Sequence, residues 1–318
     1  MKAAIVMEAG ATPLYGEFRE PVPASGEVRV TVSAAALSNV VRSRASGNHY
    51  SSSGQLPFVV GIDGTGRLDD GCRVYFALPQ APFGSMAERT VVHPSQCISL
   101  PDDLDDVTAA AIANPGMSAW AAFKERARLL KEERVLVNGA TGTAGRLAVQ
   151  IAKYMGAGKV VATGRNAEAL KAVAELGADV TIPLGDCGDA FEDALKEQFG
   201  DDGIDVVLDY LWGQSAERIL VAGAKAGKET VPIRFVHVGS ASGPDITLPG
   251  AALRSSAITL LGSGIGSIPL EKLMESIHDL LQATVSGGFE IVTRTFPLSD
   301  VEQVWATADG TARTVFQM

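Results

Sequence analysis

The stretch that decides the fold is Asn138-Gly139-Ala140-Thr141-Gly142-Thr143-Ala144-Gly145. It lies between the apolar run 134–138 and the amphipathic segment 146–155, the pattern of a buried strand, a turn and a helix. Its three glycines form a variant of the G-x-G-x-x-G motif. In that motif they make the tight turn, let a pyrophosphate approach the backbone and let the helix pack on the strand, while amides at the helix start bind phosphate. We therefore expect residues 139–145 to bind a dinucleotide; a plain strand–turn–helix of small residues is the alternative.

Predicted strands alternate with predicted helices from residue 134 onward. The six strands expected are 134–138, 159–163, 180–182, 204–208, 233–238 and 258–261. Such alternation predicts an α/β fold with a doubly wound parallel sheet. Ligands of these sheets bind beyond the carboxyl ends of the strands, so we expect two loops, Val238-Gly239-Ser240 and Gly262-Ser263-Gly264, to contact the nicotinamide end of a dinucleotide. Ordinary turn chemistry is the alternative for their glycines.

The end of the second strand, Thr163-Gly164-Arg165-Asn166, indicates which dinucleotide is bound. An NAD site usually has an Asp or Glu there, which accepts a hydrogen bond from the ribose 2′-hydroxyl. No carboxylate is present, and Arg165 offers a planar, permanently charged group that suits a 2′-phosphate. We therefore predict NADP(H), with Gly164, Arg165 and Asn166 at the cofactor and Lys171 assisting. An arginine that only caps a surface turn is the alternative.

The remainder of the chain predicts a second, mainly β domain. Short strands are expected at 28–32, 59–60, 72–76 and 87–92, separated by glycine and proline. Two helices, 107–112 and 118–130, are expected around a break at Asn114-Pro115-Gly116. After a helix at 269–283, strands at 289–293 and 313–316 and a short helix from Ser299 resemble a return to the first domain.

Composition excludes several classes of protein. The 318 residues carry a net charge of −10 and no Lys/Arg-rich run, so no nucleic-acid or anionic membrane partner is expected. No apolar stretch reaches the ~18–20 residues of a membrane span, and no signal-peptide pattern is seen, so we expect a cytoplasmic protein. The three separated cysteines, Cys72, Cys97 and Cys187, form neither a disulfide framework nor a zinc lobe.

Five further stretches are typical of one known protein family: Met1-Lys2-Ala3, Gly61-Ile62-Asp63-Gly64-Thr65-Gly66, Gly71-Cys72-Arg73-Val74, Gly84-Ser85-Met86-Ala87-Glu88 and residues 109–120. With the glycine loop, they make nearly the whole chain resemble the zinc-independent quinone oxidoreductases of the medium-chain dehydrogenase/reductase superfamily. The resemblance implies NADPH-dependent reduction of quinones, enones or enals. It also implies a GroES-like catalytic domain, 1–117 and 266–318, split around a Rossmann domain, 118–265. A homodimer that pairs the strands at 257–261 is a further implication.

The same resemblance implies that no metal is bound. Zinc-bearing relatives hold the metal at positions that correspond to Asn39, Ile62 and Asn114. Asn, Ile and Asn cannot build a three-ligand zinc site, so no metal ligand is predicted. Without a Lewis acid, simple alcohol dehydrogenation loses its usual mechanism.

The catalytic candidates follow from the resemblance too. Tyr50 lies in a polar loop where relatives carry a tyrosine facing the nicotinamide, so its hydroxyl is expected to hold the substrate oxygen or deliver a proton. A tyrosine packed under a loop is the alternative. Asn39 is expected to face the nicotinamide ribose or the substrate, and Ser118 matches a threonine beside the nicotinamide.

Weaker candidates have a simpler interpretation in each case. His49 could donate a proton, and Arg42 and Arg44 could orient an acidic substrate, although surface roles are favoured for all three. Tyr210 could flank the cofactor or only pack. Two functional alternatives stay open: an enoyl-thioester reductase of the same superfamily, and a non-catalytic NADPH-binding sensor.

Overall fold

The glycine stretch lies between strand β9 (Arg134–Asn138) and helix α3 (Thr143–Tyr154), as the sequence predicts. The structure is a computed structural model that describes residues 1–48, 55–200, 203–307 and 312–318. The chain divides into two units: unit 1 comprises Met1–Asn114 and Ile277–Met318, and unit 2 comprises Pro115–Ser276. Their boundaries follow residues 114 and 276, where the sequence predicts 117 and 265.

Unit 2 contains a six-stranded parallel sheet in the order β11-β10-β9-β12-β13-β14. Its strands after β9 are β10 (Lys159–Gly164), β11 (Val180–Pro183), β12 (Val206–Asp209), β13 (Ile233–His237) and β14 (Ile258–Gly262). The order reverses at β9, which is the doubly wound arrangement predicted from the alternating pattern. The α/β fold class is therefore confirmed.

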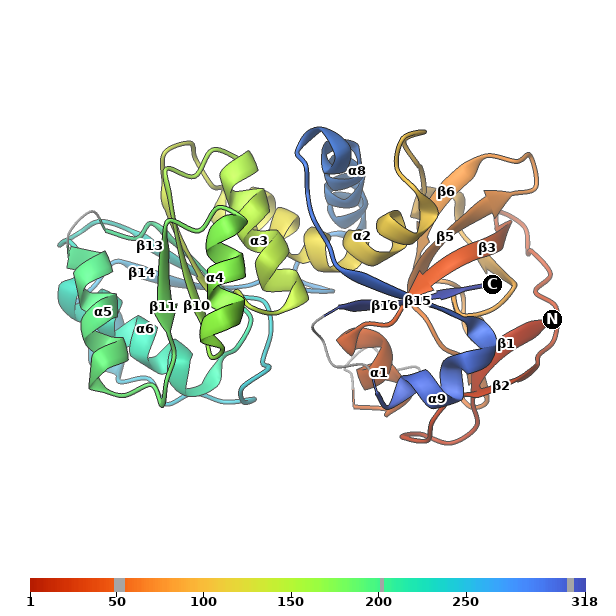
Figure 1. Ribbon diagram of the computed structural model, residues 1–318, viewed down its shortest axis with the longest axis horizontal. Helices are drawn as coiled ribbons and strands as arrows, with labels where there is room; N and C mark the ends of the chain where they lie inside the picture. Colours follow the sequence, from red (N-terminus) through yellow and green to blue (C-terminus); the bar gives the residue numbers. More distant parts are fainter. Residues whose placement is uncertain (49–54, 201–202, 308–311) are drawn as a thin grey trace. The chain divides into compact units, whose positions relative to one another are not determined.

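Helices cover both faces of this sheet. Figure 1 shows α3 and α4 (Ala167–Glu175) on one side of the strands, and α5 (Asp189–Gly200) and α6 (Gly213–Ala226) on the other. Strands β9, β10 and β12 are almost wholly buried, since each is covered on both faces. Leu136, Phe199 and Phe235 are among the largest buried side chains of this core.

Unit 1 is mainly antiparallel. One sheet has the order β2-β1-β4, and a second has the order β15-β16-β3-β5-β6-β8, with β7 pairing β3. The strands are β1 (Lys2–Val6), β2 (Leu14–Glu17), β3 (Val28–Ala36), β4 (Phe58–Val59), β5 (Asp63–Leu68), β6 (Arg73–Ala77), β7 (Arg89–Val92), β8 (Cys97–Ser99), β15 (Thr293–Pro297) and β16 (Arg313–Gln317). Strand β16 pairs with β3, so the end of the chain joins the sheet of the N-terminal segment.

The remaining elements are short, apart from two helices. They are α1 (Asn39–Ala45), η1 (Pro94–Gln96), α2 (Asp106–Ala121), η2 (Ala122–Ala127), α7 (Gly250–Arg254), α8 (Leu270–Ser286), η3 (Leu298–Asp300) and α9 (Val301–Trp305). Among the residues described, no helix is both long and apolar enough to traverse a lipid bilayer.

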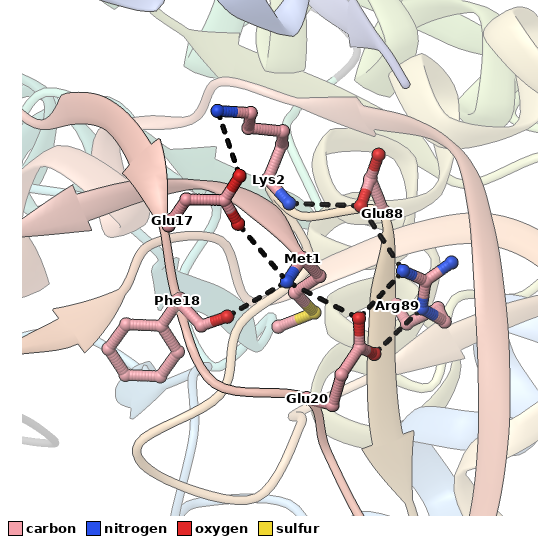
Figure 2. Close-up of polar contacts among 7 residues, drawn as sticks. All are labelled: Met1, Lys2, Glu17, Phe18, Glu20, Glu88 and Arg89. Atoms are coloured by element: carbon pink, nitrogen blue, oxygen red, sulfur yellow. Dashed lines mark hydrogen bonds and ion pairs between the residues drawn. The ribbon is translucent and has the colours of Figure 1, made fainter.

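The backbone of β1 is tied to neighbouring segments by a cluster of charges (Figure 2). The Met1 ammonium lies 3.3 Å from Glu20 and 3.5 Å from Glu17, and it donates a hydrogen bond to the Phe18 carbonyl. Glu20 also accepts two hydrogen bonds of 2.8 Å from Arg89. This bidentate contact joins the segment after β2 to β7, 69 residues further along the chain.

Two element predictions are wrong. No break occurs at Asn114-Pro115-Gly116, because α2 runs through Pro115 and continues into η2. Proline removes one helical hydrogen bond, but the flanking apolar residues, 109–113 and Ala119, are fully buried, so packing outweighs that loss. The predicted strand at 289–293 instead starts at Thr293. The apolar side chain of Phe289 is instead buried just after the end of α8, where the Phe289 amide donates a hydrogen bond to the Thr284 carbonyl.

Candidate functional site

The glycine loop is shaped by contacts that leave no room for side chains at its far end. A Cβ placed on Gly145 would lie 2.3 Å from the Gly139 carbonyl oxygen and 2.6 Å from Ala140 Cα. Both are backbone atoms, so only glycine lets the first turn of α3 pack this closely on the loop.

Gly142 differs from Gly145, because a Cβ there would have only the Gly139 carbonyl oxygen within reach, at 4.0 Å. As the N-cap residue of α3, Gly142 has no side chain to bond the amides of the first turn. Open space beside amides at a helix start suits an anion, and the positive end of the helix dipole favours one. The loop therefore fits the pyrophosphate of a dinucleotide.

A buried polar network holds this loop in place. Asn138 donates to Asp209 Oδ1 at 2.7 Å and to Ser215 Oγ at 2.9 Å, and it accepts from Thr163 Oγ1 at 2.7 Å. These side chains are all buried and come from β9, β10, β12 and the start of α6. Because every partner is satisfied, the network fixes the strand ends rather than costing stability.

Sequence reasoning did not identify this network as part of the site. Asp209 also accepts hydrogen bonds from the amides of Leu211 and Trp212, so it shapes the turn that follows β12. The available signal was a polar residue at the end of each apolar strand: Asn138, Thr163 and Asp209.

The end of β10 carries the residues predicted to select the cofactor. Gly164 is the last residue of β10, and Arg165 is exposed directly after it. Among the residues described, none forms a hydrogen bond or ion pair with the Arg165 side chain, which leaves the guanidinium available to a 2′-phosphate.

The neighbours of Arg165 are already engaged. Asn166 caps α4, since its side chain accepts a hydrogen bond from the Ala169 amide at 3.0 Å. Lys171 forms an exposed ion pair of 2.9 Å with Glu168 on the same helix. Arg165 is therefore the strongest candidate of the three for the phosphate.

The two loops predicted at the nicotinamide follow β13 and β14, at the same edge of the sheet as the glycine loop. The amides of Val238 and Gly239 donate to the Asp209 carbonyl, and Ser240 Oγ lies 3.4 Å from His237 Nε2. In the second loop, the Ser263 amide donates to the His237 carbonyl, and the Gly264 amide donates to Ser267. Gly262 ends β14, and its carbonyl accepts from Arg126.

Ser118 and Tyr210 meet at the end of β12. Their hydroxyl oxygens are 3.3 Å apart, and Ser118 donates to the Pro115 carbonyl at 2.6 Å. A carbonyl oxygen can only accept a hydrogen bond, so the Ser118 hydroxyl donates its proton to Pro115. The Tyr210 hydroxyl is therefore the donor in its contact with Ser118. Burial raises the pKa of Tyr210 well above its ordinary value. The pair is thus neutral and polar, and it lies within unit 2.

The catalytic candidates of unit 1 are only partly described. Tyr50 and His49 lie outside the described residues. Asn39 is the exposed first residue of α1, which Ser38 caps. Ile62 is buried in an apolar cluster, and Asn114 is partly buried in α2. Arg42 and Arg44 are both partly buried rather than fully exposed, and burial lowers the pKa of each guanidinium.

The known proteins that are similar to this chain are oxidoreductases. Residues 144–283 match the family model described as "Zinc-binding dehydrogenase". A probable NADPH-dependent quinone reductase of Emericella nidulans is 29% identical over 97% of this chain and 97% of its own length. A quinone oxidoreductase of Lama guanicoe is 28% identical over 91% of this chain and 96% of its own. The quinone oxidoreductase of Thermus thermophilus, solved also with NADPH, has a TM-score of 0.83 and 27% identity, with 100% of both chains covered.

Proposed function

Because the chain belongs to the medium-chain dehydrogenase/reductase superfamily and is of the quinone oxidoreductase type, we propose that it is an NADPH-dependent reductase of quinones or α,β-unsaturated carbonyl compounds. The observation that carries the proposal is the glycine loop with Arg165 at the end of the next strand, a site built for a phosphorylated dinucleotide. NADPH supplies the hydride, and the protein supplies position and electrostatics.

The residues of unit 2 have distinct roles in this proposal. Amides from Gly142 to Gly145 bind the pyrophosphate, and Arg165 binds the 2′-phosphate. The loops at 238–240 and 262–264 hold the nicotinamide end, and the Ser118–Tyr210 pair offers a hydroxyl oxygen that accepts a hydrogen bond there.

On the side of the acceptor, Asn39 and Tyr50 remain the candidates for hydrogen bonding to the oxygen that gains charge. Tyr50 lies outside the described residues, whereas Asn39 is exposed at the start of α1, which supports its part of the proposal. A proton reaches the reduced product from a side chain or water.

The proposal includes a mechanism without zinc. It rests on residue chemistry, since Ile62 has no ligand atom and neutral Asn39 and Asn114 are poor substitutes for thiolates. Metal analysis of the purified protein tests it, because zinc bound in a one-to-one ratio would overturn it.

Two finer points also belong to the proposal. A homodimer that pairs β14 strands is supported by the position of β14 at the edge of its sheet, with Leu260 38% exposed. A cytoplasmic location is supported by three free cysteines, as is usual in a reducing compartment.

The experiment that tests the function is a turnover screen with NADPH in excess and three neutral acceptors: 9,10-phenanthrenequinone, 1,4-benzoquinone and an enal. We expect NADPH oxidation to depend on both enzyme and acceptor, with NADH a poorer donor. Tight NADPH binding without turnover of any acceptor would identify a sensor instead. Turnover of an enoyl thioester alone would identify the thioester reductase.

A further inference from the structure

Unit 1 contains a pocket that the proposed chemistry does not yet use. Its volume is about 240 Å³, a little below the ~300–1,000 Å³ usual for small-molecule sites. Apolar side chains from Val41, Phe58, Ile62 and Phe83 form much of its wall. A pocket of this size and lining fits the apolar body of a small, one-ring or two-ring molecule.

Arg44 is the one charged residue among the described residues that line the pocket. Burial lowers the pKa of its guanidinium, and no opposing effect from an acid accompanies that shift. Within the described part of the chain, its side chain forms no hydrogen bond or ion pair. A charge taken partly out of water without a counter-charge is costly, so a site of this kind is most stable with an anion bound.

Arg42 also has a buried guanidinium nitrogen, Nη2, without a hydrogen-bond partner among the described residues, but its surroundings differ from those of Arg44. It lies on the same short helix, and its pKa is also lowered by burial. Its guanidinium, however, lies 5.7 Å from the ring centroid of Trp305, and Arg42 does not line the pocket. Of the two arginines in α1, Arg42 lies over an aromatic ring, and Arg44 lines the pocket without a hydrogen bond or ion pair to any described residue.

We propose that this pocket binds a small organic anion, with the carboxylate paired to Arg44 and the apolar body against Val41, Phe58 and Ile62. The identity of that anion rests on the proposed function: it is the hydride acceptor, an unsaturated compound or quinone that carries an acidic group. Helix α1 supports this identity, because it places Arg44 on the same element as Asn39, the candidate that faces the acceptor. Arg44 is then a specificity residue, since it selects acidic acceptors over neutral ones.

Binding is tested first, without turnover, by calorimetric titration with benzoate and with benzamide. The two have the same ring, but only benzoate is charged. We expect wild-type protein and Arg42→Gln to bind benzoate about 10- to 100-fold more tightly than benzamide, the range for a charge-assisted hydrogen bond. Arg44→Gln should remove that preference, and Arg44→Lys should restore part of it. Equal binding of the two probes by wild-type protein, or no binding of either, would overturn the proposal.

Selection during turnover is tested with cinnamaldehyde and 4-carboxycinnamaldehyde as acceptors. The ratio of their kcat/KM values is compared between variants, so differences in intrinsic reactivity cancel. We expect Arg44→Gln to lower kcat/KM for 4-carboxycinnamaldehyde, relative to kcat/KM for cinnamaldehyde, by about 10- to 100-fold. The change should come from a higher KM for the acid, and the kinetic constants for the neutral enal should change little. A ratio equal in wild type and Arg44→Gln would refute the role of Arg44 while the proposed reductase activity stands. No turnover of either enal or of the neutral quinones would refute the reductase activity. The titration with benzoate would then still test whether the pocket binds a small organic anion.

Discussion

Replacing Arg165 with alanine should convert the preference for NADPH over NADH into near equality. The guanidinium is exposed at the end of β10, without a hydrogen bond or ion pair inside the described part of the chain. No hydrogen bond or ion pair among the described residues is therefore lost in the variant, and its melting temperature should match that of wild type. The loss should appear only in the free energy of binding to the ligand that carries the 2′-phosphate.

The size of the loss follows from the contact that Arg165 makes. A hydrogen bond to a charged group contributes about 1.5–3 kcal/mol, which corresponds to about a 10- to 150-fold rise in the Kd for NADPH. Exposure to solvent places the effect toward the lower end of this range, and added salt should shrink it further. The Kd for NADH should change by less than about twofold, since NADH lacks the phosphate.

The assay is a fluorescence titration of both nucleotides against wild type, Arg165→Ala and Lys171→Ala. Lys171 is a matched control, because it is a nearby exposed cation already paired with Glu168. Equal weakening of NADPH and NADH in Arg165→Ala would refute the assignment. A larger effect from Lys171→Ala than from Arg165→Ala would refute it as well, and would place the phosphate on α4.

Four further changes test other parts of the structure. Gly145→Ala should lower stability by about 1–3 kcal/mol and weaken both nucleotides, because its Cβ meets backbone atoms; an unchanged melting curve would contradict this. Gly142→Ala should leave thermal stability near that of wild type yet weaken nucleotide binding in titrations, because its Cβ has room in the loop where the pyrophosphate is expected. Arg89 holds the pKa of Glu20 down at about 2, so this contact contributes stability above the ordinary value of 4.5 that is lost as pH falls toward 2. Since the Glu20 side chain is 52% exposed, Glu20→Gln should lower the free energy of unfolding in urea by less than about 1 kcal/mol at neutral pH. Below pH 2, where Glu20 is protonated in the folded protein, the substitution should have no effect. Burial raises the pKa of Asp63 from 3.8 to about 6, so the stability that its protonated form contributes is lost as pH rises through that interval. Asp63→Asn should therefore make the free energy of unfolding less dependent on pH between these values. An unchanged pH profile would contradict this.

The predictions from sequence succeed where a local pattern and burial agree. The inner strands β9, β10 and β12 of the parallel sheet are apolar runs covered on both faces, so their positions can be predicted from the residues themselves. The positions of the loop at 139–145 and of Arg165 directly after β10 also agree with the sequence pattern, while their roles in cofactor binding stay predictions. Where apolar residues serve another purpose, prediction fails. The pattern around Phe289 predicts a strand, but Phe289 is buried just after the end of α8. Pro115 predicts a helix break, but it lies within α2.

The sequence by itself determined the doubly wound sheet, the place of the glycine loop between its first strand and helix, and the cofactor NADPH, because each depends on residues that are neighbours in the chain. Only the tertiary structure decided which polar side chains are satisfied and which are not. Asn138, Thr163 and Asp209 form one buried network only because three strands end side by side. Arg42 and Arg44 look alike in the sequence, yet one is stacked on Trp305 and the other lines an apolar pocket. That difference depends on chain segments far from α1, which the local pattern around the helix does not contain.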